Sequence, residues 1–231
     1  LDHTILHFST KLNININQMK RPYMDYFLQQ IYQYYDIAIW SQTHWKWLEI
    51  KLIELGMLDN PMYRISFVLD KSSMFRYGEN NVYIKPLHII WSKFPQWGKH
   101  NTLHIDDLDR NFLLNPSNGI QVSPYRREGS NEDVENDNRD NERKRSSSSL
   151  NDDNQSEDNE LLLLARYLTH MQSQSDVSNI NHKVWRDCAY QLSQSDLEFQ
   201  QNYTSSSPSP SSSKDSSNDN NNNNNSSNEE K

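Results

Sequence analysis

The sequence predicts an α/β fold in which a central, mostly parallel sheet is flanked by helices. Short and nearly continuous apolar runs lie at residues 36–40, 65–69 and 102–105, and such runs are typical of strands that are buried on both faces. Stretches with helical spacing of apolar residues separate these runs. Strands that alternate with helices usually form a parallel sheet that helices cover on both sides.

Two helices are expected around the first of these strands. Apolar residues follow i, i+3, i+4, i+7 spacing over residues 24–31, and Pro22 just before them is typical of a helix start. A second apolar face runs over residues 45–55, and Gly56 can end that helix. Both helices are amphipathic, so each is expected to pack one face on the sheet.

Further elements are expected in the second half of the chain. Residues 119–122 form a candidate edge strand that Pro124 stops, and residues 161–171 form an apolar helix. Trp185 is expected to be a packing anchor, and His182 a helix-packing residue rather than a catalyst. Most of the other tryptophans are expected in the core, with a peptide-binding face as the alternative: Trp40, Trp45, Trp47, Trp91 and Trp97.

Hydrophobic residues make up 34% of the 231-residue chain, and their distribution predicts its organisation. Large apolar side chains concentrate in residues 1–127, the expected main domain, and return in residues 161–200, its expected helical C-terminal part. Residues 128–160 are acidic and Ser-rich, and residues 201–231 are Ser- and Asn-rich. These two stretches have too few apolar side chains to offset the entropy cost of ordering, so a disordered insertion and a disordered tail are predicted.

The charge of the chain is unevenly distributed. Residues 1–127 carry 14 Lys and Arg against 11 Asp and Glu, whereas the remainder carries 9 against 20. The main domain is therefore mildly cationic and would not repel a phosphorylated partner, although such a charge is also ordinary. The basic cluster at residues 143–145 could be a nuclear import signal, a polyanion contact or simply a solvated part of the insertion.

Other sequence features bear on the compartment and on the start of the chain. Cys188 is the single cysteine, which excludes an intrachain disulfide and favours a reducing compartment. No signal peptide is recognisable, and no apolar run is long enough to cross a bilayer. The chain begins without Met, inside what looks like the end of a strand. We therefore expect a fragment whose first strand lies upstream of Leu1.

Polar residues follow the ends of three predicted strands. Asp2 follows the strand expected upstream, Ser41 follows residues 36–40, and Asp106 and Asp107 follow residues 102–105. The carboxyl ends of parallel strands form the binding edge of an open α/β sheet, so these residues are expected to converge. Mg²⁺ binds carboxylate oxygens together with water and substrate phosphate, and Lys85 could neutralise the phosphate. This pattern predicts a magnesium-dependent phosphoryl-transfer site.

The motifs resemble those of a known family. Residues 1–4 resemble the Asp-x-Asp-x-Thr motif of the haloacid-dehalogenase superfamily of aspartyl-phosphate phosphotransferases, in all but its opening Asp. Other stretches resemble one branch, the ubiquitin-like-domain-containing CTD phosphatases, relatives of the small RNA polymerase II CTD phosphatases. These stretches are residues 21–22, 34–41, 46–47, 54–56, 85–87, 90–94 and 106–119. The resemblance covers residues 1–127 and resumes at 161–167 and 181–185.

The resemblance implies a Rossmann-like α/β fold without a large cap domain, and it implies roles for single residues. Asp2 matches the general acid/base, which protonates the leaving seryl oxygen and then activates water, and its backbone carbonyl would bind the metal. Ser41 matches the residue that hydrogen-bonds the transferring phosphate, and Lys85 matches the motif lysine. Asp106 matches a Mg²⁺ ligand, and Asp107 belongs to the same metal site as the partner of Asp106.

Some positions of the motifs carry less information. Thr4 matches the structural threonine of the first motif, and Asn111 belongs to the last motif without an assigned role. Ser41 could also cap the helix that begins near Thr43. The aspartyl nucleophile has no match, because it would stand immediately before Leu1. The fragment by itself is therefore expected to be inactive or nearly so.

The resemblance implies a nuclear, Mg²⁺-dependent protein serine/threonine phosphatase that acts through an aspartyl-phosphate intermediate. Expected substrates are phosphorylated proteins, such as subunits of the 26S proteasome regulatory particle or RNA polymerase II CTD-like phosphopeptides. A monomer is expected, with no direct nucleic-acid binding and no membrane contact. The alternative is a non-catalytic phosphoprotein- or proteasome-binding module of the same fold. A small-molecule phosphatase is disfavoured, because the connections between motifs are too short for a large cap.

Overall fold

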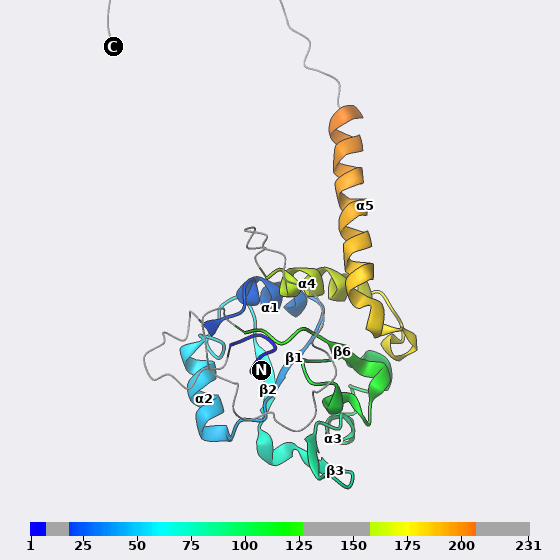
Figure 1. The fold of residues 1–231 in the computed structure, drawn as a ribbon. Coiled ribbons are helices and arrows are strands. Elements are labelled where there is room, and N and C mark those ends of the chain that lie inside the picture. The colour runs from blue at the N-terminus through cyan, green and yellow to red at the C-terminus, as the bar shows by residue number, and fades with distance from the viewer. Residues whose placement is uncertain (8–18, 127–157, 207–231) are drawn as a thin grey trace, which may run out of the picture. The chain divides into compact units, whose positions relative to one another are not determined.

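The structure is a computed structural model that describes residues 1–7, 19–126 and 158–206 (Figure 1). The chain divides into two compact units, Leu1–Ser195 and Asp196–Lys231. The first unit contains every strand of the described residues, and the described part of the second, residues 196–206, is helical. No helix within the described ranges is long and apolar enough to cross a membrane.

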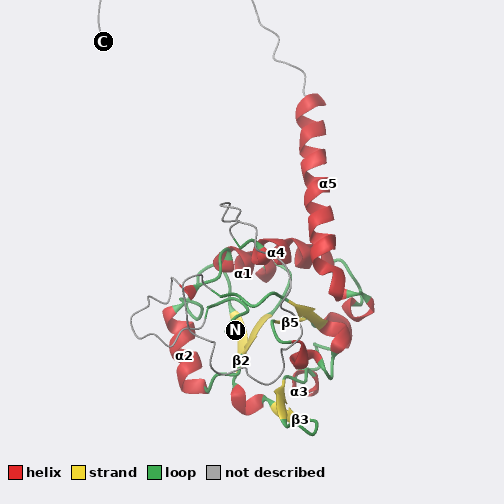
Figure 2. Cartoon of the chain, viewed as in Figure 1, coloured by secondary structure: helices red, strands yellow, loops and turns green. Residues whose placement is uncertain are grey.

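Helices and strands alternate through most of the first unit (Figure 2). Short 3-10 turns connect several of them. The elements are α1 (Met24–Tyr32), β1 (Ile37–Trp40), α2 (Trp45–Glu54), β2 (Ile65–Leu69), β3 (Phe75–Tyr77), β4 (Val82–Ile84), α3 (His88–Lys93), β5 (His104–Asp106), β6 (Gly119–Gln121), α4 (Glu160–Met171) and α5 (Trp185–Ser206).

The strands are mostly parallel. β1 pairs with β2 in parallel, with Trp40 opposite Leu69, and β5 pairs with β6 in parallel, with Ile105 opposite Ile120. β3 and β4 form an antiparallel hairpin. The predicted α/β fold is confirmed. In the described residues, however, the strands form three two-stranded sheets instead of the single central sheet that was expected.

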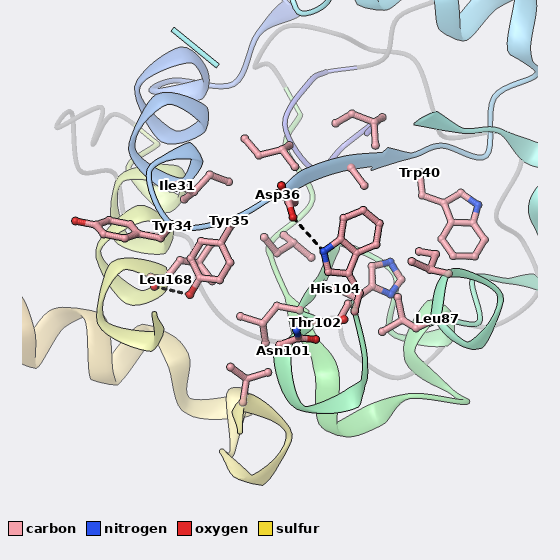
Figure 3. Close-up of a pocket in the computed structure, with 18 of the residues that line it drawn as sticks. Ile31, Tyr34, Tyr35, Asp36, Trp40, Leu87, Asn101, Thr102, His104 and Leu168 are labelled. Carbon is pink, nitrogen blue, oxygen red and sulfur yellow. Dashed lines mark hydrogen bonds between the residues drawn. The ribbon is translucent and has the colours of Figure 1, made fainter. Parts of the chain in front are cut away.

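A cavity of about 420 Å³ lies between β1 and β5, which do not pair with each other (Figure 3). Trp40 of β1 and His104 of β5 stand on its walls and stack on each other, with ring centroids 6.5 Å apart. Leu1 also lines the cavity. The two parallel pairs are therefore separated by this space, and the strand expected upstream of Leu1 stays a prediction.

The predicted helix faces form the main hydrophobic core. The four apolar residues that predicted α1 are all buried, and α1 packs against α4, which lies beside it in Figure 1. α2 buries Leu48 and Leu52 and is followed by Gly56, whose φ of +66° is the left-handed conformation that commonly ends a helix. Tyr35 donates a hydrogen bond from its hydroxyl to the Leu168 carbonyl of α4 at 2.8 Å.

The tryptophans differ from the expectation. Trp185 is 1% exposed and is the packing anchor that was predicted. Trp45 and Trp47 are 44% and 66% exposed, because α2 contributes only a narrow face to the core. The other three, at positions 40, 91 and 97, are half-buried.

Arg21 joins three separate segments of the first unit. Its buried guanidinium donates hydrogen bonds to the carbonyls of Thr4 and Ser123, both at 2.9 Å, and forms an ion pair with Asp158 at 3.0 Å. Asp158 stands two residues before α4, so Arg21 fixes the start of that helix beside the N-terminal motif. Arginine suits this position because its planar group donates several hydrogen bonds in a fixed geometry.

The two stretches that were predicted to be disordered lie partly among the described residues. Of the predicted insertion at residues 128–160, residues 128–157, including the basic cluster at 143–145, lie outside the described residues, and α4 already begins at Glu160. Of the predicted tail, residues 201–206 belong to α5, and residues 207–231 lie outside the described part.

His182 is buried beneath α4 as a neutral packing residue. Its Nδ1 lies 2.7 Å from the Tyr167 hydroxyl and its Nε2 lies 2.8 Å from the Val177 carbonyl. A carbonyl can only accept, so Nε2 carries the proton and Nδ1 accepts from Tyr167. Burial lowers the pKa of His182 below its ordinary value, and the bond to Val177 only partly opposes this.

We predict that His182 makes the fold acid-sensitive. Because its folded pKa is lowered, its stabilising effect is complete above the unfolded pKa of about 6.5 and is lost as the pH falls toward the folded pKa. The free energy of unfolding should therefore decrease as the pH falls below about 6.5, by at most about 1.4 kcal/mol per pH unit for this group. Urea denaturation of His182→Gln should show a smaller decrease over the same interval. An unchanged pH dependence would contradict the assignment.

Candidate active site

A pocket of about 390 Å³ opens at the carboxyl ends of β1 and β5. Asp2, Lys85, Asp106 and Asp107, four of the five predicted site residues, line it together. Segments that are far apart in the sequence meet there. The remaining lining residues are Leu1, His3, Gln42, Thr43, Leu108, Asn111, Pro124 and Arg126.

Lys85 and Asp106 form a buried ion pair on the floor of this pocket. The Lys85 ammonium lies 2.6 Å from Asp106 Oδ2, and both side chains are almost fully buried. Lys85 also donates to the carbonyl of Trp40 at 3.0 Å, so it ties the end of β1 to the end of β5. Burial by itself would raise the pKa of Asp106, but the neighbouring His104 ring and the Lys85 charge outweigh it and hold that pKa well below its usual range.

The second oxygen of Asp106 is held by the turn that follows β5. Oδ1 accepts hydrogen bonds from the backbone N–H of Leu108 at 2.9 Å and from the side-chain amide of Asn111 at 2.8 Å. Asn111 had no assigned role in the sequence, and the structure shows that it orients Asp106. Phe112 closes this turn onto β6 at Gly119, where a Cβ would lie only 2.5 Å from the Phe112 ring.

Asp107 is held from the N-terminal motif. The Thr4 hydroxyl donates a hydrogen bond to Asp107 Oδ1 at 3.0 Å. Thr4 is buried, so this bond fixes the half-buried carboxylate in one orientation. The structural threonine of the first motif thus acts on the acidic pair of the last motif, 103 residues further along the chain.

Asp2 reaches the pocket with both carboxylate oxygens engaged. Oδ1 accepts from the Lys51 ammonium at 2.7 Å, and Oδ2 accepts from the Thr43 hydroxyl at 2.8 Å. Burial would raise the pKa of Asp2, but the positive charges of the Leu1 amino group and of Lys51, together with these two hydrogen bonds, lower it overall.

Ser41 differs from the other predicted residues. It is 1% exposed at the end of β1, and it does not appear among the residues that line the pocket. Its hydroxyl oxygen accepts from the Thr43 N–H at 3.1 Å. The alternative role of Ser41 as the cap of the next helix is wrong. That helix, α2, begins at Trp45, and the Trp45 N–H donates its hydrogen bond to Asp70 at 2.8 Å.

Several residues of the pocket region were not predicted as site residues. Thr43, Lys51 and Asn111 hold the predicted carboxylates, and Arg126 lines the pocket. The sequence held a signal for Asn111, which belongs to the last motif, and for Lys51, because this cation lies between two buried leucines of the α2 face. Its partner Asp2 is 49 residues away, so the pattern could not have identified the pair.

The oxygen donors of the pocket suit a hard cation in kind. No three His, Cys, Asp or Glu side chains of the described residues gather into a complete ligand set. The available donors are the carboxylates of Asp106 and Asp107, the carbonyl of Asp2, and Asn111 Oδ1, which is buried without a hydrogen-bond partner. Mg²⁺ usually takes few protein carboxylates and keeps water and phosphate oxygens, so a partial donor set of this kind fits it.

We predict that Lys85 stabilises the fold through its pairing with Asp106. Lys85→Met would leave Asp106 buried without a countercharge and should lower the free energy of unfolding by about 3 kcal/mol or more. The double variant Lys85→Met with Asp106→Asn removes both charges and should recover much of the loss. Urea denaturation measures both values.

A matched control for this prediction is Lys20→Met. Lys20 pairs with Asp25 at 3.0 Å, but the Asp25 side chain is 54% exposed, so the loss should stay below about 1 kcal/mol. If Lys85→Met and the double variant lose the same free energy of unfolding, the ion-pair account is contradicted, because lost packing alone would then explain the result.

Comparison with known proteins agrees with this geometry. The family model described as NLI interacting factor-like phosphatase matches residues 1–178. The ubiquitin-like domain-containing CTD phosphatase 1 of Xenopus tropicalis is 37% identical over 172 residues, which are 73% of this chain and 47% of the relative. The human protein of that name is 34% identical over 189 residues, covering 80% and 52%.

The similarity extends to plants. The ubiquitin-like domain-containing CTD phosphatase of Arabidopsis thaliana is 36% identical over 190 residues, which are 80% of this chain and 48% of the relative. The chain thus spans about half the length of the curated relatives it matches. Because the family model covers most of the chain and includes every residue of the pocket, the chain belongs to the NLI interacting factor-like phosphatase family.

Proposed function

We propose that the protein to which this chain belongs is a Mg²⁺-dependent protein serine/threonine phosphatase that works through an aspartyl-phosphate intermediate. The observation that carries the proposal is the meeting of Asp2, Lys85 and Asp106 in one pocket at the strand ends. An acid/base carboxylate, a buried cation and an anchored second carboxylate are the groups that phosphoryl transfer requires. Membership of a phosphatase family supports the same reaction class.

In the first step, the carboxylate of an aspartate immediately before Leu1 attacks the phosphorus of a phosphoserine or phosphothreonine. The bond between phosphorus and the seryl oxygen breaks, and Asp2 gives that oxygen a proton, so the product leaves as a neutral alcohol. The Lys85 ammonium balances negative charge that gathers on the transferring group. Ser41, at the end of β1, is proposed to donate a hydrogen bond to the phosphate.

In the second step, Asp2 takes a proton from a water molecule whose oxygen attacks the phosphorus. The acyl phosphate bond breaks, which frees inorganic phosphate and restores the nucleophile. Asp106, Asp107, the Asn111 amide oxygen and the Asp2 carbonyl would hold Mg²⁺. When bound, the ion supplies additional positive charge to the phosphate oxygens.

The proposed substrate is a phosphorylated protein. The relatives are named CTD phosphatases, which supports a phosphorylated peptide such as a CTD-like segment. From the family resemblance we also propose subunits of the 26S proteasome regulatory particle as candidate substrates and the nucleus as the compartment. The mild positive charge of residues 1–127 is compatible with a phosphorylated partner. We propose that the protein acts as a monomer.

The activity prediction concerns the chain extended upstream with the residues that precede Leu1 in the full-length protein. With Mg²⁺, this form should hydrolyse p-nitrophenyl phosphate and a phosphoserine peptide, and EDTA should abolish both reactions. Asp106→Asn should reduce kcat by about 10²-fold or more, because it removes a charged group from the reacting centre. Circular dichroism should establish that the variant remains folded.

Asp109→Asn is the matched control, since Asp109 lies in the same motif but is exposed outside the pocket. It should leave the rate unchanged. Absence of turnover by the extended and folded protein would contradict the proposed function and would favour a phosphoprotein-binding module. Turnover that persists in EDTA would contradict the metal dependence alone.

A further inference from the structure

Two side chains from outside the family motifs donate hydrogen bonds to the carboxylate of Asp2. Lys51, in the middle of α2, donates to Oδ1 at 2.7 Å, and Thr43, in the turn before α2, donates to Oδ2 at 2.8 Å. Lys51 and Asp2 are 14% and 22% exposed, so the ion pair is largely shielded from water. A shielded and hydrogen-bonded pair holds its geometry better than a surface pair does.

The turn and the helix that carry these two donors are held in place by further hydrogen bonds. Asp70, at the end of β2, accepts the Trp45 N–H at 2.8 Å and so fixes the first turn of α2. The Thr43 carbonyl accepts the N–H of Lys71 at 3.2 Å. Leu48 and Leu52 bury the face of α2 from which Lys51 projects. Lys51 and Thr43 therefore approach Asp2 from a rigid support, which is a requirement for precise placement of a reacting group.

Thr43 also connects Asp2 with Ser41. Its N–H donates to Ser41 Oγ at 3.1 Å while its hydroxyl donates to Asp2. A serine hydroxyl has one O–H donor in addition to its acceptor sites, so Ser41 keeps that donor for another group. One residue thus sets the orientation of two residues that were predicted to act in the reaction.

The two donors differ in a way that suits a group that gains and loses a proton. An ammonium can only donate, so Lys51 keeps hold of Oδ1 throughout. A hydroxyl can donate or accept, so Thr43 can face Oδ2 whether or not this oxygen carries a proton. The arrangement leaves Oδ2 as the oxygen that exchanges the proton, while Oδ1 serves as the fixed point of the side chain.

We propose that Lys51 and Thr43 are positioning residues that hold the Asp2 carboxylate in its working orientation for both proton transfers. This inference rests on the proposed function. Neither residue exchanges a proton or touches the phosphate; both act through Asp2. A small displacement of an acid/base group is costly, so loss of either donor should slow the steps that need proton transfer.

The test compares two substrates in the extended protein. A phosphoserine peptide has a strongly basic leaving oxygen that requires a proton, whereas p-nitrophenyl phosphate has a weakly basic one that leaves without it. With enzyme in excess over substrate, so that only the first step is followed, Lys51→Met and Thr43→Val should each slow release of the leaving group about tenfold more for the peptide than for p-nitrophenyl phosphate. KM should change little for either substrate, because substrate binding does not use these side chains.

Conservative variants and a control complete the test. Lys51→Arg and Thr43→Ser retain the donors and should restore most of the peptide activity. Lys46→Met replaces an exposed lysine on the same helix and should leave both activities unchanged. Because Lys51 and Thr43 lie on different elements, failure of one variant to fold still leaves the other as a test.

The outcomes separate this inference from the proposed function. Equal losses of the first-step rate on the two substrates, or no loss at all, in a protein that Asp106→Asn inactivates would overturn the positioning role alone. Absence of turnover in the parent protein would overturn both. Selective loss on the peptide, with rescue by the conservative variants, is the result that the positioning role predicts.

Discussion

The buried ion pair between Lys85 and Asp106 is the contact on which the arrangement of the strands and the site depends. The two parallel pairs, β1 with β2 and β5 with β6, do not hydrogen-bond to each other. Lys85 connects them at their carboxyl ends, because it donates to the Trp40 carbonyl and to the Asp106 carboxylate. A charge that is taken out of water needs such a partner, so the pair holds the strand ends together and places a cation on the pocket floor.

Each carboxylate of the pocket is oriented by a polar side chain that donates a hydrogen bond to it. Asn111 holds Asp106, Thr4 holds Asp107, and Lys51 with Thr43 holds Asp2. The acidic side chains are therefore anchored individually instead of forming one closed metal cage. An open, preorganised arrangement suits a reaction in which phosphate oxygens and water complete the coordination of a hard cation.

Local sequence patterns predicted the main helices and strands, but they could not predict contacts between distant segments. The apolar spacing of α1 and the left-handed Gly56 after α2 follow from neighbouring residues, so the sequence was sufficient for both. Two contacts join distant segments: the hydrogen bond from the first turn of α2 to Asp70, and the ion pair between Lys51 and Asp2. No periodic sequence pattern encodes either of them. The position of residues after strand ends correctly predicted that Asp2, Asp106 and Asp107 would meet in one pocket, but it did not predict that Ser41 would lie outside the pocket lining.

The measurement that tests the account most directly is the trapping of a phosphorylated enzyme. The extended protein carrying Asp2→Asn would be incubated with p-nitrophenyl phosphate and Mg²⁺, quenched in acid and analysed by mass spectrometry. This substrate needs no proton for its leaving group, so phosphorylation should proceed while hydrolysis of the intermediate slows. The account predicts that phosphate accumulates on the nucleophile that we propose, an aspartate immediately before Leu1. A phosphate on any other residue, or none in a protein that turns over, would contradict it.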